Sequence, residues 1–257
     1  MNNTVMKTFE ILKLVSKHKE GLTLTQIVKA LNLPKSTVYN ILQSLAELEM
    51  LSTADEPAPV YRLGIEAFKI GLSYINGSTL DSVARPILSS LCHELNETVF
   101  MSVRSGTSDL VYIMKYLSDS EFQTISSVGT VRSMLSVAMG KAMLATMTDE
   151  EIVRIVPKEM FHDCSIPTIT DYESLLAFIH QTREIGYVIE STAENPQFAS
   201  PVAAPVLGAN GELVGAVSIV IMHDPNNEAR VHELGRKINA TALQISNGLG
   251  YLRDALF

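Results

Sequence analysis

A row of short hydrogen-bonding side chains near the N-terminus could contact the edges of DNA bases. The apolar residues between them, from Val38 to Leu45, recur at steps of three and four and predict a helix with one buried face. The opposite face has no Asp or Glu before Glu47, which suits DNA because phosphates repel carboxylates while hydroxyl and amide groups pair with bases. The outward residues are Lys35, Ser36, Thr37, Tyr39, Asn40, Gln43 and Ser44.

Two predicted helices before this face would position it. The first starts near the N-terminus and is expected to end with Gly21 as its C-cap. Thr23 and Gln26 have the spacing of a capping box for the second, which Pro34 ends because proline is not tolerated inside a helix. The inward residues of the second helix are expected to be Ile27, Ala30 and Leu31. This order predicts a helix-turn-helix, although an ordinary three-helix core with a neutral exposed face would share the pattern.

A β-hairpin is predicted directly after the third helix, where a winged helix-turn-helix has its wing. The segments 51–53 and 60–63 have strand character, and the loop over 54–59 contains two prolines and two acidic residues. Arg62, at the base of the hairpin, is the residue there that is best able to contact phosphate. We therefore expect the wing to add little affinity for DNA.

Charge is distributed unevenly along the 257-residue chain, whose net charge is −8. Residues 1–75 hold eight basic and seven acidic residues, which gives +1, and the remainder of the chain carries −9. The first part can approach a polyanion, whereas the rest would be repelled by one. The charge distribution therefore predicts two parts with different tasks.

The remaining two thirds of the chain alternate between predicted helices and strands. A helix from Gly64 to about Asn76 connects them to the first part, and the following order favours an α+β domain with an antiparallel sheet. Helices are predicted over 83–95, 136–147, 150–156, 172–184 and 226–252, and strands over 98–104, 110–116, 187–191, 200–207 and 213–222. The last helix is expected to bury Leu234, Ile238, Ala242, Ile245, Leu249 and Leu252, and the helix over 83–95 buries Leu91 with either Val83, Ile87 and Leu95 or Leu88.

The sequence shows no pattern typical of an enzyme or a metal centre. Nucleophile-elbow and phosphate-loop patterns are absent, the six His have no paired spacing, and Cys92 and Cys164 are isolated. We therefore expect no catalytic residues, no cofactor and no metal. Isolated cysteines without a secretory signal favour the cytoplasm, and the longest apolar stretch, over 216–222, is too short to span a membrane. A sensor whose helix-turn-helix contacts only protein is the alternative to a DNA-binding protein.

Several stretches resemble one known family. They are GLTLTQIVKALNLPKSTVYNILQSLAELEML with the later YRLG, GTVRSMLSVAMGKAMLA, residues 186–190, and SPVAAPVLGANGELVGAVSIV. Over nearly its whole length the chain resembles the isocitrate lyase regulator (IclR) family of transcription regulators. The resemblance implies a winged helix-turn-helix over 1–63, a linker helix over 64–79 and a GAF-like effector-binding domain over 80–257. It also implies a homodimer or homotetramer that represses or activates from a double-stranded DNA operator.

Asn40 departs from many members of that family, which have Arg at this position. Asn pairs with adenine through two hydrogen bonds, whereas Arg prefers guanine. We therefore predict that Asn40 shifts operator preference toward A·T at one position. Thr25 and Arg62 complete the expected DNA contacts, together with the outward face of the third helix.

The resemblance also implies an effector pocket in the C-terminal domain. Leu135 and Val137 occupy positions where His and Thr are common in the family, and several methionines lie nearby. Because methionine adapts to varied shapes, we expect an organic effector more apolar than a sugar acid, such as an aromatic carboxylate, with Ser218 at its polar end. A cavity partly filled by repacked core is the alternative. The expected lining residues are Met134, Leu135, Ala138, Met139, Glu190, Pro201, Ser218 and Val220.

Overall fold

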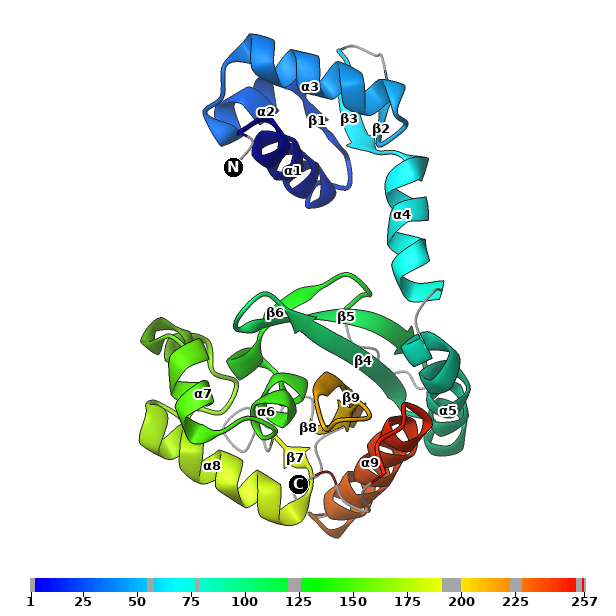
Figure 1. Ribbon diagram of the computed structural model, residues 1–257, viewed down its shortest axis with the longest axis vertical. Coiled ribbons are helices and arrows are strands. Elements are labelled where there is room, and N and C mark those ends of the chain that lie inside the picture. The colour runs from blue at the N-terminus through cyan, green and yellow to red at the C-terminus, as the bar shows by residue number, and fades with distance from the viewer. Residues whose placement is uncertain are drawn as a thin grey trace. The chain divides into compact units, whose positions relative to one another are not determined.

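The computed structural model describes residues 3–54, 58–76, 79–119, 126–190, 200–221, 228–252 and 256. The chain divides into two compact units, Met1–Ser78 and Thr79–Phe257, which Figure 1 colours from blue to cyan and from teal to red. Each unit has an apolar core of its own and is described by itself.

The N-terminal unit is a helix-turn-helix with a small antiparallel sheet. Its elements are α1 (Asn3–Ser16), β1 (Leu22–Thr23), α2 (Leu24–Leu31), α3 (Lys35–Glu47), β2 (Leu51–Ala54), β3 (Val60–Leu63) and α4 (Ile65–Asn76). The strand order β1-β3-β2 confirms the predicted hairpin and adds β1, a short strand that the sequence pattern did not predict. Thr23 and Gln26 form the predicted capping box of α2, so this helix begins where its local sequence requires.

Two details of the N-terminal unit differ from the expectation. α1 ends at Ser16 instead of continuing to Gly21, which has a φ of 80° and lies in the turn before β1. A Cβ on Gly21 would lie 2.6 Å from Cγ1 of Val60, so glycine allows this turn to approach β3 closely. Ala30 is exposed, contrary to the prediction, because the buried side of the short helix α2 is centred on Ile27.

The C-terminal unit is built on a six-stranded antiparallel sheet with the strand order β6-β5-β4-β9-β8-β7. Its strands are β4 (Thr98–Ser105), β5 (Asp109–Tyr116), β6 (Val131–Ser133), β7 (Val188–Ile189), β8 (Ser200–Leu207) and β9 (Leu213–Ile221). Its helices are α5 (Thr79–Leu95), α6 (Ala138–Leu144), α7 (Asp149–Ile155), α8 (Tyr172–Ile185) and α9 (Glu228–Gly248), with short 3₁₀ turns η1 (Met134–Ser136) and η2 (Lys158–Asp163). The predicted α+β class with an antiparallel sheet is confirmed.

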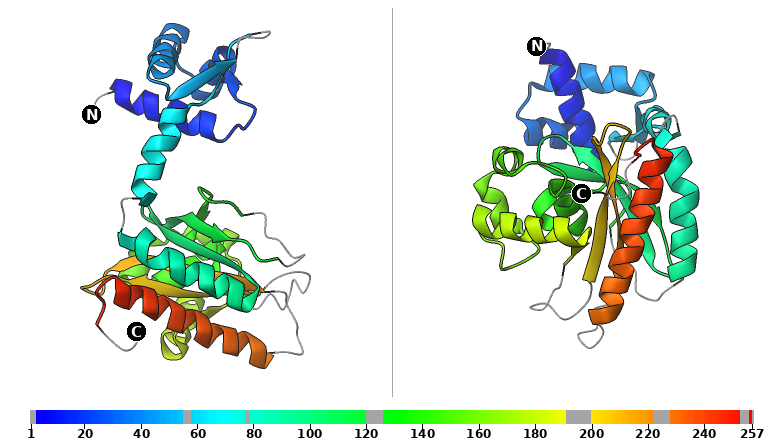
Figure 2. Two further views of the ribbon diagram at one scale, coloured as in Figure 1. Left: turned by 90° about the vertical axis from the view of Figure 1, so that its right-hand side faces the viewer. Right: turned by 60° about the horizontal axis from the view of Figure 1, so that its bottom comes forward.

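Helices cover both faces of this sheet. α5 and α9 lie side by side on one face, and α6, α7 and α8 lie on the other (Figures 1 and 2). Because both faces are covered, β8 and β9 are buried along most of their length, which explains their continuous apolar sequences. The cavity described below lies on the face covered by α6.

Local capping explains where the helices around α6 begin and end. Thr148 caps α7 in a capping box with Glu151, and Asp171 caps α8 in the same way with Ser174. Gly186, with a φ of 88°, ends α8 as its C-cap, where the sequence predicted the end of this helix.

The helix predicted over 136–147 is wrong in its first part. The chain forms the 3₁₀ turn η1, then extends at Val137, with φ −150° and ψ 150°, and only then begins α6. A Cβ on Gly140 would lie 2.1 Å from the carbonyl oxygen of Met134, so the glycine lets α6 rest directly on this turn.

The buried faces of the two long helices also differ in part from the prediction. On α5 the second alternative is confirmed, because Leu88 and Leu91 are buried. On α9 the prediction of Leu252 is wrong, since the helix ends at Gly248 and the side chain of Leu252 is 92% exposed. No helix within the described ranges combines the length and apolar character needed to cross a bilayer.

Candidate DNA-binding surface and effector cavity

The outward face of α3 presents the polar row that the sequence predicts. The apolar stripe from Val38 to Leu45 is buried, and the first turn of the helix holds no acidic residue. Pro34 precedes α3 without a side-chain cap, so the backbone N–H groups of the first turn can meet an anion such as phosphate. Lys35, Ser36, Tyr39, Asn40, Gln43 and Ser44 are exposed, and Thr37 is half-buried.

Two of the predicted DNA contacts, Ser44 and Arg62, have neighbours that affect what they can do. Thr25 is exposed on α2. The Ser44 hydroxyl donates to the carbonyl oxygen of Asn40 at 3.1 Å, so its proton is used within α3. Nε of Arg62 donates to the carbonyl oxygen of Glu20 at 3.1 Å, which holds the guanidinium against the turn before β1. The acidic tip of the predicted wing, at residues 55–57, lies outside the described residues.

A cavity of about 180 Å³ lies in the C-terminal unit where the sequence analysis expected the effector pocket. It opens between the sheet and the chain around the start of α6. Six of the eight expected residues line it: Ala138, Met139, Glu190, Pro201, Ser218 and Val220.

Met134 and Leu135, the other two expected residues, are fully buried and are not among the lining residues. They belong to η1, on which α6 rests, so their side chains fill the core instead of facing the cavity. The Leu135 backbone still contributes to the site, because its carbonyl oxygen accepts a hydrogen bond from Nζ of Lys141 at 2.6 Å.

Five further residues line the cavity that the sequence analysis did not include. Phe100 of β4 and Tyr112 of β5 form an edge-to-face pair with ring centroids 5.4 Å apart. Burial raises the pKa of the Tyr112 phenol by more than the charge of Arg132 and a hydrogen bond with Ser126 lower it, so the phenol stays neutral near neutral pH. No local sequence pattern links β4 and β5 to α6. These residues come together only through the pairing of strands in the folded sheet. The added residues are Phe100, Tyr112, Ser126, Ser136 and Val137.

Lys141 is the most unusual residue near the cavity, and the sequence analysis did not single it out. It is fully buried, and its Nζ lies 2.6 Å from Oε1 of Glu190. A buried ammonium requires such a partner, since an uncompensated buried charge is strongly destabilising. A lysine inside the apolar stretch of α6 was the signal that could have indicated it.

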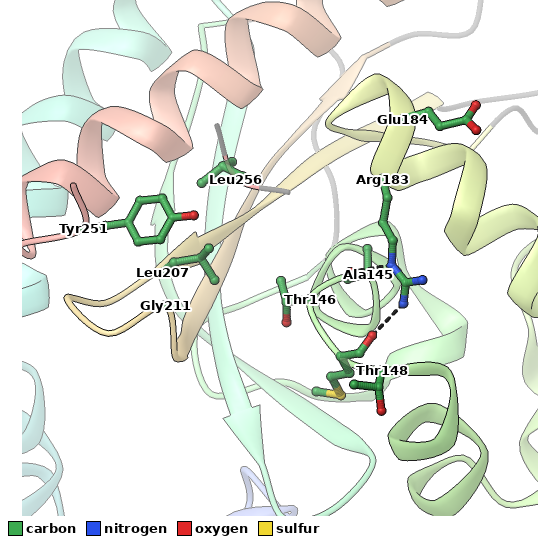
Figure 3. Close-up of a pocket in the computed structure, with 10 residues that line it drawn as sticks. Ala145, Thr146, Thr148, Arg183, Glu184, Leu207, Gly211, Tyr251 and Leu256 are labelled. Carbon is green, nitrogen blue, oxygen red and sulfur yellow. Dashed lines mark hydrogen bonds between the residues drawn. The ribbon is translucent and has the colours of Figure 1, made fainter. Parts of the chain in front are cut away.

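A second and larger cavity, of about 620 Å³, lies elsewhere in the C-terminal unit, between the end of α6, the end of α8 and Tyr251 (Figure 3). Its prominent charged group is Arg183, which donates to the carbonyl oxygens of Ala145 and Met147 and pairs with Asp149 at 3.0 Å. These bonds use three of its five N–H donors, one on each nitrogen, and hold the guanidinium against the backbone at the end of α6. Six of the eight residues expected at the effector pocket line the smaller cavity, whereas none of them lines this larger one.

Comparison with known proteins identifies the two units. Residues 4–55 match the IclR helix-turn-helix domain, and residues 72–247 match the bacterial transcriptional regulator IclR C-terminal domain. The chain belongs to the IclR family. As a member of the IclR family, it is a DNA-binding transcription regulator that responds to a ligand through its C-terminal domain.

Individual relatives are similar to this chain over nearly its whole length. The HTH-type transcriptional regulator KipR of Bacillus subtilis is 27% identical over 250 residues, which cover 97% of this chain and 98% of KipR. An IclR transcriptional regulator from Alicyclobacillus acidocaldarius shares the fold with a TM-score of 0.81, at 21% identity over 97% of this chain and all of that one. An IclR homolog from Microbacterium hydrocarbonoxydans, solved with 4-hydroxybenzoate, has a TM-score of 0.76 at 18% identity over 96% and 99%.

Proposed function

We propose that this IclR-family regulator acts in the cytoplasm as a homodimer or homotetramer on a double-stranded DNA operator and has no catalytic role. Residues 1–63 would bind DNA, 64–79 would link the parts, and 80–257 would bind the effector. The observation that carries the proposal is the exposed face of α3, which is polar and has no carboxylate before Glu47 at its end, in a chain of net charge −8. One such helix buries little surface, so specific binding requires at least two copies on paired half-sites.

The proposed DNA contacts lie on three elements of the N-terminal unit. Side chains on α3 would read base edges, while Thr25 on α2 and Arg62 on β3 would contact phosphates. Because Arg62 is already bonded to Glu20, we expect it to contribute less than Lys35, which is exposed at the start of α3. The α3 residues proposed at the DNA are Lys35, Ser36, Thr37, Tyr39, Asn40, Gln43 and Ser44.

The proposed effector is a small, largely apolar organic molecule in the 180 Å³ cavity. A cavity of about 150 Å³ holds a benzene ring, so this one has room for one ring and a small substituent. The 4-hydroxybenzoate bound to the Microbacterium homolog is a molecule of this size, which supports the proposal. The effector would change DNA binding only through different affinities for two arrangements of the oligomer.

Selection from random DNA, followed by salt titration, tests the DNA-binding surface. The full-length protein should enrich a two-fold symmetric site, and its affinity should fall with salt by about 0.9 in log–log slope for each phosphate neutralised. Lys35→Ala should reduce that slope by about 0.9 for each bound copy of the chain, because each copy loses one phosphate contact. Lys158→Ala removes the same charge from an exposed site in the C-terminal unit and should leave the slope unchanged.

The opposite results would refute the DNA-binding surface. If no sequence is enriched, the helix-turn-helix serves protein contact instead. If Lys35→Ala and Lys158→Ala behave alike, α3 does not meet phosphates at its N-terminal end.

A further inference from the structure

The buried lysine beside the effector cavity has no hydrogen left for a ligand. Nζ of Lys141 lies 2.6 Å from each of three acceptors: the carbonyl oxygen of Leu135, the hydroxyl of Ser165 and Oε1 of Glu190. An ammonium group has three N–H donors, and these three bonds use them all. Lys141 therefore positions Glu190 through Oε1, but it has no N–H left to bind an acid that enters the cavity.

Glu190 presents a hydrogen-bond acceptor to the cavity. It is 3% exposed, it lines the cavity, and its backbone N–H donates to the carbonyl oxygen of Pro201 at 3.0 Å. Oε1 accepts from both Lys141 and Ser165, whereas Oε2 makes no hydrogen bond within the described residues. A carboxylate only accepts hydrogen bonds, so a ligand group that satisfies it must be a donor.

The opposite side of the cavity is aromatic. Nζ of Lys115 lies 5.4 Å from the centroid of the Phe100 ring and donates to the carbonyl oxygen of Ser126 at 2.8 Å. Phe100 and Ser126 line the cavity on the β4 and β5 side, across the sheet from Glu190. The cavity therefore offers a hydrogen-bond acceptor toward β7 and an aromatic, apolar lining toward β4 and β5. A ligand acid group would be repelled near Glu190 and could not satisfy its acceptor.

We infer that Glu190, held in place by Lys141, selects an effector of one-ring size that carries a hydroxyl or amino donor at the β7 end of the cavity. This inference rests on the proposed effector site and adds the chemistry of its specificity. Lys141 acts as a positioning residue, and Glu190 is the residue that touches the ligand. A site that binds a ligand hydroxyl discriminates strongly against an analogue without it, because the site's acceptor is then left unpaired.

Three ring compounds of similar size differ in the group opposite the methyl. This group is a hydrogen-bond donor in 4-methylphenol, neutral and without a donor in 4-fluorotoluene, and a charged acceptor in 4-methylbenzoate. Calorimetry on the full-length protein should show 4-methylphenol binding at least about tenfold more tightly than either of the others. Equal affinity for 4-fluorotoluene would overturn the inference, since fluorine has a similar size but donates no hydrogen bond. Tighter binding of 4-methylbenzoate would overturn it as well.

A paired substitution tests the role of the carboxylate itself. Glu190→Gln alone leaves Lys141 buried without a counter-charge and can unfold the protein, so Lys141→Met is combined with it. The double variant should bind 4-methylphenol and 4-methylbenzoate with affinities that differ by less than about threefold, because the repulsive charge is gone and the amide can donate. Glu173→Gln, at an exposed position on α8, should keep the preference of the parent protein. An unchanged preference in the double variant would overturn the inference.

One more variant distinguishes failure of this inference from failure of the proposed site. Ala138 lines the cavity and is 2% exposed, so Ala138→Phe should fill the cavity and abolish binding of all three compounds. If the compounds bind this variant normally, the effector site is elsewhere and both proposals fail. If none of them binds the parent protein, the one-ring effector is wrong, and this inference fails with it while DNA binding through α3 stands. If binding requires Ala138 but ignores the hydroxyl group, only the inference about Glu190 is wrong.

Discussion

Asn40 illustrates how one side chain on an exposed helix face can determine sequence preference. It is exposed on α3, and its side-chain amide makes no hydrogen bond within the described residues, so the amide is available for a base. We predict that Asn40→Arg changes one operator position from A·T to G·C, because Arg pairs with guanine where Asn pairs with adenine. Selection from random DNA with both proteins would show the change, at about 1–3 kcal/mol of discrimination for that position.

The selection with Asn40→Arg can also exclude a base contact at this position. An identical consensus for the parent and the Asn40→Arg protein would mean that residue 40 does not reach a base. Lys158→Arg, which alters an exposed side chain of the C-terminal unit, should leave the consensus unchanged and serves as the control.

At the scale of elements, the N-cap residue of α8, Asp171, is expected to make the stability of the protein depend on pH. The pKa of the Asp171 carboxyl is lowered by a hydrogen bond from the backbone N–H of Ser174 and by one from its hydroxyl. When a carboxyl has a lower pKa in the folded chain than in the unfolded chain, it stabilises the folded chain at pH values above its unfolded-state pKa. This stabilisation is lost as the pH falls through the folded-state pKa.

Asp171→Asn should therefore affect stability at neutral pH more than in acid. The amide keeps a capping oxygen but carries no charge, so the variant should unfold at a lower temperature than the parent at pH 7. The difference in Tm should shrink as the pH is lowered below about 4, where the unfolded carboxyl takes up its proton. Melting curves across this pH range test the prediction, and a constant difference in Tm would assign the loss to geometry instead of charge.

At the scale of the whole molecule, the proposed oligomer predicts a fixed spacing between operator half-sites. Paired recognition helices reach successive major grooves on one side of DNA, which repeat about every 10 base pairs. Inserting five base pairs between the half-sites should turn one of them to the far side and weaken binding at least tenfold. Inserting ten should not restore the affinity, because the second half-site returns to the same side but lies about 34 Å beyond the fixed spacing. Gel-shift titrations of the three operators measure this, and equal binding to all three would contradict a fixed dimer.

Much of the N-terminal unit could be predicted from sequence because its determinants are local. The apolar stripe of α3, the capping box at Thr23 and the strands of the hairpin depend on residues within a few positions of each other. The C-cap at Gly186 is equally local. Ala30 was predicted wrongly because helical periodicity does not show how wide the buried stripe of a short helix is.

The effector cavity could be predicted only in part. The family resemblance indicated residues such as Glu190, Ser218 and Val220, but it also included Met134 and Leu135, whose side chains η1 turns into the core. Phe100 and Tyr112 reach the cavity through strand pairing, which no local pattern specifies.

The sequence by itself determined the family, the order of most of the elements, several helix caps and the polar face of α3. The tertiary structure alone decided which side chains enclose the cavity and how its charges are paired. The clearest case is the bond between Lys141 and Glu190, which are 49 residues apart in sequence and 2.6 Å apart in the fold. The physical reason is that helix periods and caps act over a few residues, whereas a buried charge finds its partner only when distant segments pack together.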